Sequence, residues 1–364
     1  MTIALLTNRF PPALDGVGDY TFFLAAELAG KGQTVHVVCR KQPENTGPAN
    51  VTIHQVTNNW GQDSNTILFA LLRETNPDWL VLQYVPYAFQ PLGLPFFLPK
   101  LLRRIRRAGV RICVMFHEVH IRPKGVKGWI IGNLQRFIAR QLCRNADAVV
   151  TSNEFYEQML APFCPEVQVI PVGANIVVEP LPEDTRSQFR KRHFPNASFV
   201  VATFGNRDIS EMEQAVRRLS GEGVGLLVCG VARTGYLSPT DLGIHLQCAD
   251  LFVLPDPVSL RGEGGTSLKS GSLAAAFAAG LPVVGVRGDM SREPLRHGHN
   301  IWLAENGDAA GLYDAIRLLI ADPALIEKLR INGQALYQEH LRWEVIARQY
   351  LEILAHPTNL SPDA

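Results

Sequence analysis

Short runs of apolar and β-branched residues alternate with amphipathic stretches through the first half of the chain. The amphipathic stretches predict helices, among them residues 20–30, 66–75 and 99–108. Seven intervening runs have the length and composition of buried strands: residues 2–7, 34–40, 51–56, 79–85, 111–117, 146–153 and 167–173. This order of elements predicts a parallel sheet whose strands are joined by crossover helices.

The second half shows the same alternation after a charged, proline-rich stretch that has no apolar period. Its pattern predicts strands at 199–205, 224–230, 251–256 and 281–286, and helices near 210–219, 273–279 and 309–321. The fold class is therefore α/β, with two Rossmann-like doubly wound domains facing a cleft at the carboxyl ends of their strands. We predict domains at 1–178 and 198–340, a linker at 179–197 and a closing amphipathic helix at 341–356.

Length and composition support two domains and exclude some classes of partner. The chain has 364 residues, 46% of them hydrophobic, and a formal net charge of +1, so no nucleic-acid partner is indicated. Its six cysteines lack the spacing of metal ligands, which indicates a reducing cytoplasm and no metal site. No signal sequence is evident, and four prolines interrupt the longest uncharged run, residues 81–99, so no membrane-spanning helix is predicted.

Positive charge is concentrated in residues 100–144, where Glu118 is the single acid. Trp129 and Phe137 accompany the basic residues, which favours either a peripheral contact with an anionic membrane, at its inner face, or an anionic acceptor. Ordinary solvated helix faces explain the charge equally well. The twelve basic residues are Lys100, Arg103, Arg104, Arg106, Arg107, Arg111, Arg122, Lys124, Lys127, Arg136, Arg140 and Arg144.

A glycine loop, "NRFPPALDGVGDYT", follows the first predicted strand. Gly16 and Gly18 let backbone amides, that of Val17 included, approach a ligand, and the start of the next helix favours an anion. Asp15 and Asp19 flank the glycines. The spacing is not GxGxxG, so a nicotinamide nucleotide is not indicated, and a simple turn is the alternative.

Two further loops place polar residues directly after predicted strands. His117, at the end of the strand 111–117, is a better candidate to point into the cleft than His120, and a metal site is not indicated. Arg207 follows Gly205 and the strand 199–205, and its planar guanidinium suits an anion. The alternative is that Arg207 pairs with a neighbouring acid, Asp208 or Glu211.

The stretch "GGTSLKSGSLAAAFAAGLPVV" predicts a phosphate site. Ser272 is a suitable N-cap for the helix 273–279, and the helix N-terminus carries partial positive charge. Lys269, Ser270 and the amide of Gly271 add donors at the same place. The run of alanines permits close approach to a ligand or a sheet, although alanine is also simply the best helix former.

Five segments, in this order, resemble the retaining family 4 of the GT-B nucleotide-sugar glycosyltransferases. They are "PPALDGVGDYTFFLAAELAGKGQTVHVV", "FHE", "VIPVGANI", "AFAAGLPVVGVRG" and "WEVIARQYLEIL". The resemblance covers nearly the whole chain. It implies a GT-B fold in which the first domain takes the acceptor, the second takes the donor, and the closing helix crosses back to the first.

Some residues that the family usually carries are absent. Ser267 and Ala275 stand where it has two glutamates, and Met212 stands where it has a lysine. The loop "GGTSLKSGS" instead resembles a subset of the family that also lacks the glutamates. Lys269 of this chain stands where that subset has an arginine, so we expect Lys269 to supply positive charge for the diphosphate.

The resemblance implies transfer of a sugar from a UDP- or GDP-linked donor to a hydroxyl acceptor with retention, without metal or cofactor. The catalytic candidates are His117 beside the donor sugar, Arg207 and Lys269 beside the diphosphate, and Asp19 beside the acceptor. Donor binding is assigned to Gly16, Val17, Gly18, Gly205, Ser267, Ser270, Gly271 and Ser272. Two alternatives stay open: an inactive GT-B scaffold for a partner transferase, and a sugar-nucleotide epimerase, for which Glu118 and Glu263 are the obvious acids.

Overall fold

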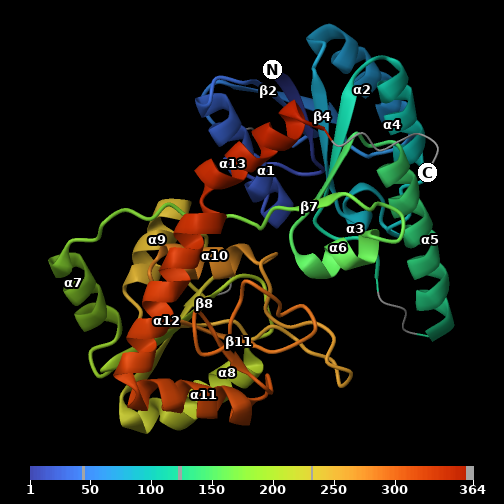
Figure 1. Cartoon of the computed structure of the whole chain (residues 1–364). Helices are drawn as coiled ribbons and strands as arrows, with labels where there is room; N and C mark the ends of the chain where they lie inside the picture. Colours follow the sequence, from blue (N-terminus) through green and yellow to red (C-terminus); the bar gives the residue numbers. More distant parts are fainter. Residues whose placement is uncertain (43–45, 122–124, 231–232, 358–364) are drawn as a thin grey trace. The chain divides into compact units, whose positions relative to one another are not determined.

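The computed structural model of the chain describes residues 1–42, 46–121, 125–230 and 233–357 (Figure 1). These residues pack as two compact units: the described residues of 1–171 with 343–357 form one, and those of 172–342 form the other. The division falls earlier than the predicted boundary at 178. Residues 172–178 belong to the second unit because the amides of Val172 and Val177 donate to the carbonyls of Leu268 and Pro239.

The first unit is built on a seven-stranded parallel sheet in the order β3-β2-β1-β4-β5-β6-β7. All seven strands coincide with the apolar runs that predicted them, and β4 and β6 are buried along their whole length. Their bounds are β1 Thr2–Leu6, β2 Thr34–Arg40, β3 Val51–Thr57, β4 Trp79–Tyr84, β5 Arg111–Phe116, β6 Ala148–Thr151 and β7 Val167–Val169.

Helices connect these strands, as the alternation predicts for a doubly wound fold. The first begins at Gly16 rather than at Tyr20, because the side chain of Asp15 accepts hydrogen bonds from the first-turn amides and so caps the helix there. The chain's last helix also belongs to this unit and packs on the first. The helices are α1 Gly16–Gly30, α2 Gln62–Thr75, α3 Pro86–Phe89, α4 Phe97–Arg107, α5 Gly125–Arg144, α6 Glu154–Leu160 and α13 Trp343–Ala355.

The second unit has a five-stranded parallel sheet in the order β12-β11-β10-β8-β9. Four of the strands were predicted. The fifth, β12, is three residues long and lies among turn residues, so it carries no periodic signal. The bounds are β8 Phe199–Phe204, β9 Val224–Cys229, β10 Leu251–Val253, β11 Val283–Val286 and β12 Trp302–Ala304.

One helix of the second unit lies inside the predicted linker 179–197. This helix, α7 (Glu183–His193), lacks an apolar period. Arg186 and Arg190 both donate to Asp250 Oδ1, at 3.0 and 2.7 Å, and Phe189 packs against the apolar cluster of the unit. The remaining helices are α8 Ser210–Leu219, α9 Pro239–Gln247, α10 Gly271–Ala278, α11 Ala309–Ala321 and α12 Pro323–Leu336, with a 3₁₀ turn at Ser220–Glu222 and a π turn at Tyr337–Leu341.

Candidate functional site

Arg207 joins three segments of the second unit that the sequence keeps apart. It follows β8, and its Nε donates to Asp256 Oδ1 at 3.0 Å in the loop after β10. Its Nη1 donates to the Phe204 carbonyl (2.8 Å) and to Ser272 Oγ (3.1 Å), and Nη2 donates to Ser270 Oγ (3.1 Å). The guanidinium therefore lies at the N-terminus of α10.

The acid that pairs with Arg207 is not one of its sequence neighbours. Asp208 accepts from the Ser210 amide, and Glu211 accepts from the Ala309 amide, so each is engaged locally. Asp256 was not a candidate in the sequence, because β8 and β10 are neighbours in the sheet but not consecutive along the chain, and such pairing leaves no spacing signal. Its second oxygen accepts from Thr266 Oγ1 at 2.9 Å.

The N-cap of α10 is Ser270 and not Ser272, which corrects the prediction. Ser270 Oγ accepts from the Leu273 amide at 3.3 Å, and the helix runs over 271–278 instead of 273–279. Ser272 is thus the second helical residue, buried, with its hydroxyl on Arg207. The error arose because Ser270, Gly271 and Ser272 are all acceptable caps by residue type.

Gly205 must be glycine for Arg207 to reach its position. Its φ is +112°, and an added Cβ would lie 2.8 Å from Arg207 Nη1 and 3.1 Å from Ser272 Oγ. Lys269 is exposed one residue before the cap. Ser267 is 2% exposed, and its Oγ has no hydrogen-bond partner among the described residues.

Asn175 is a further polar residue at this helix start, and the sequence did not single it out. A Cβ added to Gly271 would lie 3.6 Å from Asn175 Oδ1, which is buried without a hydrogen-bond partner within the described ranges. Asn175 lies in the segment "VIPVGANI" that carries part of the resemblance, which is the signal that could have found it.

The alanines of α10 are explained by packing within the second unit. Ala274, Ala275 and Ala276 are at most 1% exposed and belong to one apolar cluster. A Cβ added to Gly333 of α12 would lie 2.7 Å from the Phe277 ring, so the two helices are in close contact. Small side chains let other segments of the second unit pack closely around this helix, and this packing accounts for the run of alanines.

His117 lies at the carboxyl end of β5 in the first unit and is 8% exposed. Its Nε2 lies 2.8 Å from Gln83 Oε1, and its ring meets the Tyr20 ring edge to face at 4.8 Å. Burial lowers the pKa of His117 to about 3, so the imidazole is neutral at neutral pH. It can exchange hydrogen bonds with a sugar but does not contribute a charge.

Gln83 positions His117, and sequence reasoning missed it. It is fully buried in β4, where a polar residue interrupts the apolar run "WLVLQYV", and that interruption was the available signal. Its Nε2 has no hydrogen-bond partner in the described part of the chain. The side chain thus has one bond, to His117, and an unused donor.

The glycine loop before α1 does not present the open amides that we expected. The amides of Val17 and Gly18 donate to Asp15 Oδ1 at 3.1 and 2.8 Å. Gly16 is exposed, while a Cβ on Gly18 would lie 3.0 Å from the Arg9 carbonyl oxygen, so packing explains Gly18. An anion here has to displace the Asp15 carboxylate. Asp19 is half-buried in the first turn.

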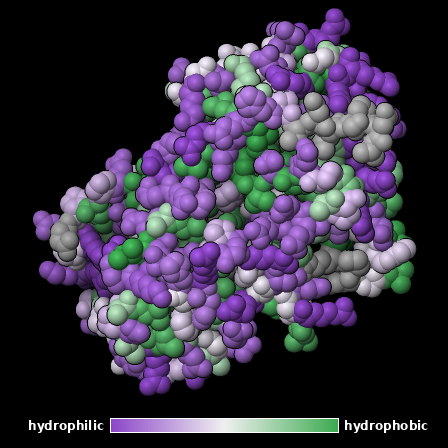
Figure 2. All heavy atoms as spheres, viewed as in Figure 1, coloured by the Kyte–Doolittle hydropathy of each residue, from purple (hydrophilic) through white to green (hydrophobic). Residues whose placement is uncertain are grey.

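The exposed face of α5 carries both apolar and basic side chains. Val126, Trp129, Ile130, Leu134 and Phe137 are 36–79% exposed and recur every three or four residues, so they share one face. Lys127, Arg136, Arg140 and Arg144 are exposed on the same helix. In Figure 2 the right margin, where α5 runs in Figure 1, carries green hydrophobic residues beside purple ones.

Only part of the basic stretch is free for a partner. Arg106 pairs with Asp147 at 3.0 Å, while Arg104 and Arg111 lie over the rings of Phe69 and Trp79. Arg122 and Lys124 lie outside the described residues. Within the described ranges, the exposed face of α5 carries more basic side chains without an ion pair or ring contact than α4 does.

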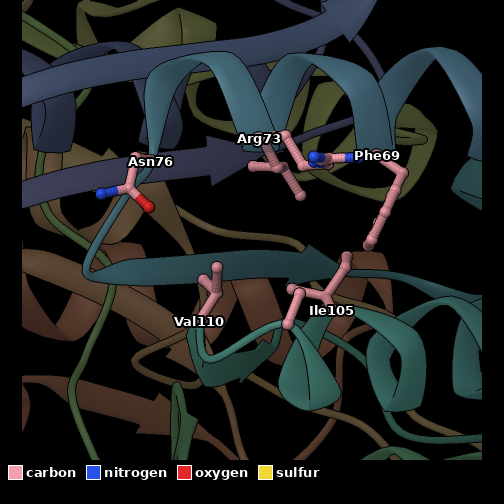
Figure 3. A pocket seen from close by; sticks show the side chains of 7 residues that line it. Phe69, Arg73, Asn76, Ile105 and Val110 are labelled. Carbon is pink, nitrogen blue, oxygen red and sulfur yellow. The ribbon is translucent and has the colours of Figure 1, made fainter.

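Two surface hollows lie elsewhere. One, of about 290 Å³, is bordered by α2 and α4, and Figure 3 shows Phe69 and Arg73 opposite Ile105 and Val110. The other, of about 520 Å³, is bordered by α8 and β9. Neither contains a predicted site residue. Among the described residues no three His, Cys, Asp or Glu side chains gather as a metal ion requires, and metal independence stays a prediction.

Residues 14–177 match the family Glycosyltransferase Family 4, and residues 178–322 match the family Glycosyl transferases group 1. A curated relative, the lipopolysaccharide core biosynthesis glycosyltransferase LpsE of Rhizobium meliloti, is 30% identical over 158 residues, 39% of this chain and 44% of the relative. The chain spans less than half the length of the curated relatives it matches.

Two solved structures share the fold over 98% of this chain. Sucrose-phosphate synthase from Thermosynechococcus elongatus has a TM-score of 0.70 at 17% identity, over 98% of its own chain. Anabaena HepE, in complex with UDP and glucose, has a TM-score of 0.69 at 15% identity, over 99% of its own chain. At such identities the likeness establishes the architecture. None of the helices in the described ranges combines the length and apolar character needed to cross a bilayer.

Proposed function

Because this chain is a GT-B glycosyltransferase, with a Glycosyltransferase Family 4 domain followed by a group 1 domain, we propose that it transfers a sugar from a nucleotide diphosphate to a hydroxyl acceptor with retention. The observation that carries the proposal is the position of Arg207 on the two serines that open α10. Hydrogen-bond donors and positive charge meet there at the carboxyl end of a parallel sheet, where ligands of this fold class bind.

The barrier to such a transfer lies in the charge that develops on the departing diphosphate. Donors fixed in advance around that charge each contribute about 3 kcal/mol. The start of α10 offers the partial charge of the helix, two serine hydroxyls and the nearby ammonium of Lys269. Ser267 and Asn175 add polar atoms that lack partners among the described residues, as a nucleotide-sugar site requires.

The donor is proposed to be UDP- or GDP-linked, with no metal or further cofactor. Anabaena HepE, which shares the fold, was crystallised with UDP-glucose, and this supports UDP as the first donor to test. The missing glutamates at Ser267 and Ala275 leave the ribose contact to other groups. We propose that no metal ion is required, because positively charged side chains of the protein take the place of a metal ion near the diphosphate.

His117 is proposed to contact the donor sugar, and Asp19 the acceptor. A neutral imidazole held by Gln83 suits hydrogen bonds to sugar hydroxyls and not proton donation from an imidazolium. With retention, the departing phosphate oxygen receives the acceptor proton on the same face, so no dedicated base is required. The acceptor class is a glycolipid, a polysaccharide or a small glycoside.

The face of α5 is proposed to dock on the surface of an anionic membrane, at its cytoplasmic side. Large apolar side chains beside lysine and arginine form the pattern that places a helix in the plane of the interface. Each basic residue near the surface contributes about 1 kcal/mol, and burial of the apolar side chains adds to this. Such docking would bring the enzyme to a lipid-linked acceptor.

A screen of nucleotide sugars tests the transferase proposal. We expect hydrolysis or transfer, detected by mass spectrometry, with at least one UDP- or GDP-sugar, and a higher melting temperature with the matching nucleotide diphosphate. A nucleotide at a hundred times its Kd stabilises the fold by about 2.7 kcal/mol. Binding without turnover for any donor and acceptor would favour the inactive scaffold, and conversion of the free sugar nucleotide to its epimer would favour the epimerase.

Liposome sedimentation tests the membrane proposal. The protein should sediment with vesicles containing phosphatidylglycerol, less at high salt, and little with phosphatidylcholine alone. Replacing Trp129 and Phe137 by serine should weaken sedimentation, whereas serine at Ile331, an apolar residue of α12 that is 51% exposed, should not. Equal loss in both variants, or none, would exclude α5 as the docking face.

A further inference from the structure

The guanidinium of Arg207 has little capacity left for a ligand. Of its five N–H groups, four donate to protein acceptors, namely Asp256, the Phe204 carbonyl, Ser272 and Ser270. The side chain is 16% exposed, as is that of Asp256. A bidentate fork on a phosphate would require it to leave these partners, so direct binding of the diphosphate is disfavoured.

The hydroxyl groups of Ser270 and Ser272, in contrast, can still donate hydrogen bonds to a ligand. Ser270 Oγ accepts from Arg207 Nη2 and from the Leu273 amide, which uses both of its lone pairs. Ser272 Oγ accepts from Arg207 Nη1. Neither hydroxyl donates to an acceptor among the described residues. Each O–H is therefore available to an anion at the first turn of α10.

A chain of hydrogen bonds fixes the arginine from behind. The amide of Val286 in β11 donates to Thr266 Oγ1 at 3.0 Å, and Thr266 donates to Asp256 Oδ2 at 2.9 Å. Gly285 admits Thr266, since a Cβ there would lie 2.6 Å from Thr266 Oγ1. Asp256 then accepts from Arg207 Nε, so β11 and the loops after β8 and β10 set one orientation of the guanidinium.

We infer that Arg207 acts on the donor diphosphate through the hydroxyl groups of Ser270 and Ser272, with Asp256 as the residue that positions it. The arginine takes one lone pair of each serine hydroxyl, so each serine faces an anion as a donor, and the charge of the guanidinium strengthens both as donors. Ser270 and Ser272 are then the residues that touch the phosphate oxygens. The inference rests on the proposed function, because it assigns roles within that donor site.

Calorimetric titration of the full-length protein with UDP, GDP and inorganic pyrophosphate tests the inference. Replacing Ser270 by glycine, which is tolerated as an N-cap, and Ser272 by alanine should each weaken the best of the three probes about tenfold. The double serine variant combines Ser270→Gly with Ser272→Ala. Adding Arg207→Gln to it should change the affinity by no more than about twofold, because the contribution that Arg207 makes through the two hydroxyls has already been lost.

Variants that keep Ser270 and Ser272 distinguish the effect of the position of the Arg207 guanidinium from the effect of its charge. Arg207→Lys keeps the charge but cannot reach both hydroxyls, so it should bind as weakly as Arg207→Gln. Asp256→Asn should weaken binding in the wild-type background and have no further effect in the double serine variant. Arg287→Gln is the matched control, since Arg287 is a more exposed arginine of the same unit that pairs with Glu305. Circular dichroism and melting curves check that each variant is folded.

Three results would overturn the inference. They are unchanged affinity in the double serine variant, wild-type affinity in Arg207→Lys, and a further tenfold loss when Arg207→Gln is added to the double serine variant. The last two would show that Arg207 touches the ligand. Failure of the wild type to bind any of the three probes would instead reject the proposed donor site, and this inference with it. The wild-type titration therefore distinguishes the two failures.

Discussion

The hydroxyl of Tyr20 on α1 donates to the hydroxyl of Tyr350 on α13 at 3.1 Å, across 330 positions of sequence. Both residues are at most 1% exposed, and burial raises the pKa of each phenol well above its ordinary value, so both stay protonated. The Tyr20 ring also meets His117 and Trp343 edge to face. The last helix of the chain thus supports the residue that packs on His117.

Replacing Tyr350 by phenylalanine should destabilise the first unit. The Tyr20 hydroxyl would lose its acceptor while it stays buried, and an unsatisfied buried polar group costs about 1–3 kcal/mol. The double variant with Tyr20→Phe should recover part of this loss, because both partners are then apolar. Chemical denaturation followed by circular dichroism measures the difference. A double variant less stable than Tyr350→Phe would contradict the assignment.

The free energy of unfolding should decrease as the pH is lowered through the range in which His117 titrates. Its pKa is 6.5 in the unfolded chain and about 3 when folded, so the unfolded state binds the extra proton between these values. The free energy of unfolding therefore decreases as the pH falls from about 6.5 towards 3, by up to about 1.4 kcal/mol per pH unit for this group. The slope should be smaller in His117→Asn, measured by denaturation at a series of pH values.

Alanine at Gly18 should destabilise the fold while alanine at Gly16 should not. The added methyl at Gly18 meets the Arg9 carbonyl oxygen at 3.0 Å, and overpacking of this kind costs about 1–3 kcal/mol. At Gly16 nothing lies within 4 Å, and alanine in a helix is favoured by about 0.5–1 kcal/mol over glycine. Melting temperatures of the two variants check this, and similar values would refute it.

Restoring a glutamate at Ala275 should not improve donor use. Ala275 is fully buried in the apolar cluster around α10, so a carboxylate there loses its hydration without gaining a partner. We expect Ala275→Glu to lower the melting temperature, whereas Ala310→Glu, at an exposed position in the first turn of α11, leaves it unchanged. A gain in turnover from Ala275→Glu would contradict the first expectation, and an unchanged melting temperature would contradict the second.

Removal of the Lys269 side chain should slow transfer without affecting the fold. Loss of one group that stabilises charge in the transition state lowers turnover about 10- to 1000-fold. Lys269 is exposed, so Lys269→Ala should keep the wild-type melting temperature. Turnover with the donor found in the screen is the measurement, and an unaltered rate would remove Lys269 from the mechanism.

Most strands could be predicted because a buried parallel strand must be apolar along its whole length. The runs at 79–85 and 111–117 are examples, and both are strands in the structure. Helix α7 could not be predicted in this way, since its sequence has no apolar period and the ion pairs with Asp250 hold it together with the packing of Phe189. The cap of α10 was misplaced because the residue types allowed three choices, and only the structure shows that Ser270 accepts from the Leu273 amide.

The sequence by itself determined the α/β class, the order of the strands along the chain and the loops that follow them, because apolar periodicity is a local property. It also placed His117, Arg207 and Ser270 at strand ends and helix starts. Only the tertiary structure decided their partners, Gln83, Asp256 and the serine hydroxyls. A hydrogen bond between side chains from different loops depends on how the strands are ordered within a sheet, and that order is not written in any one segment.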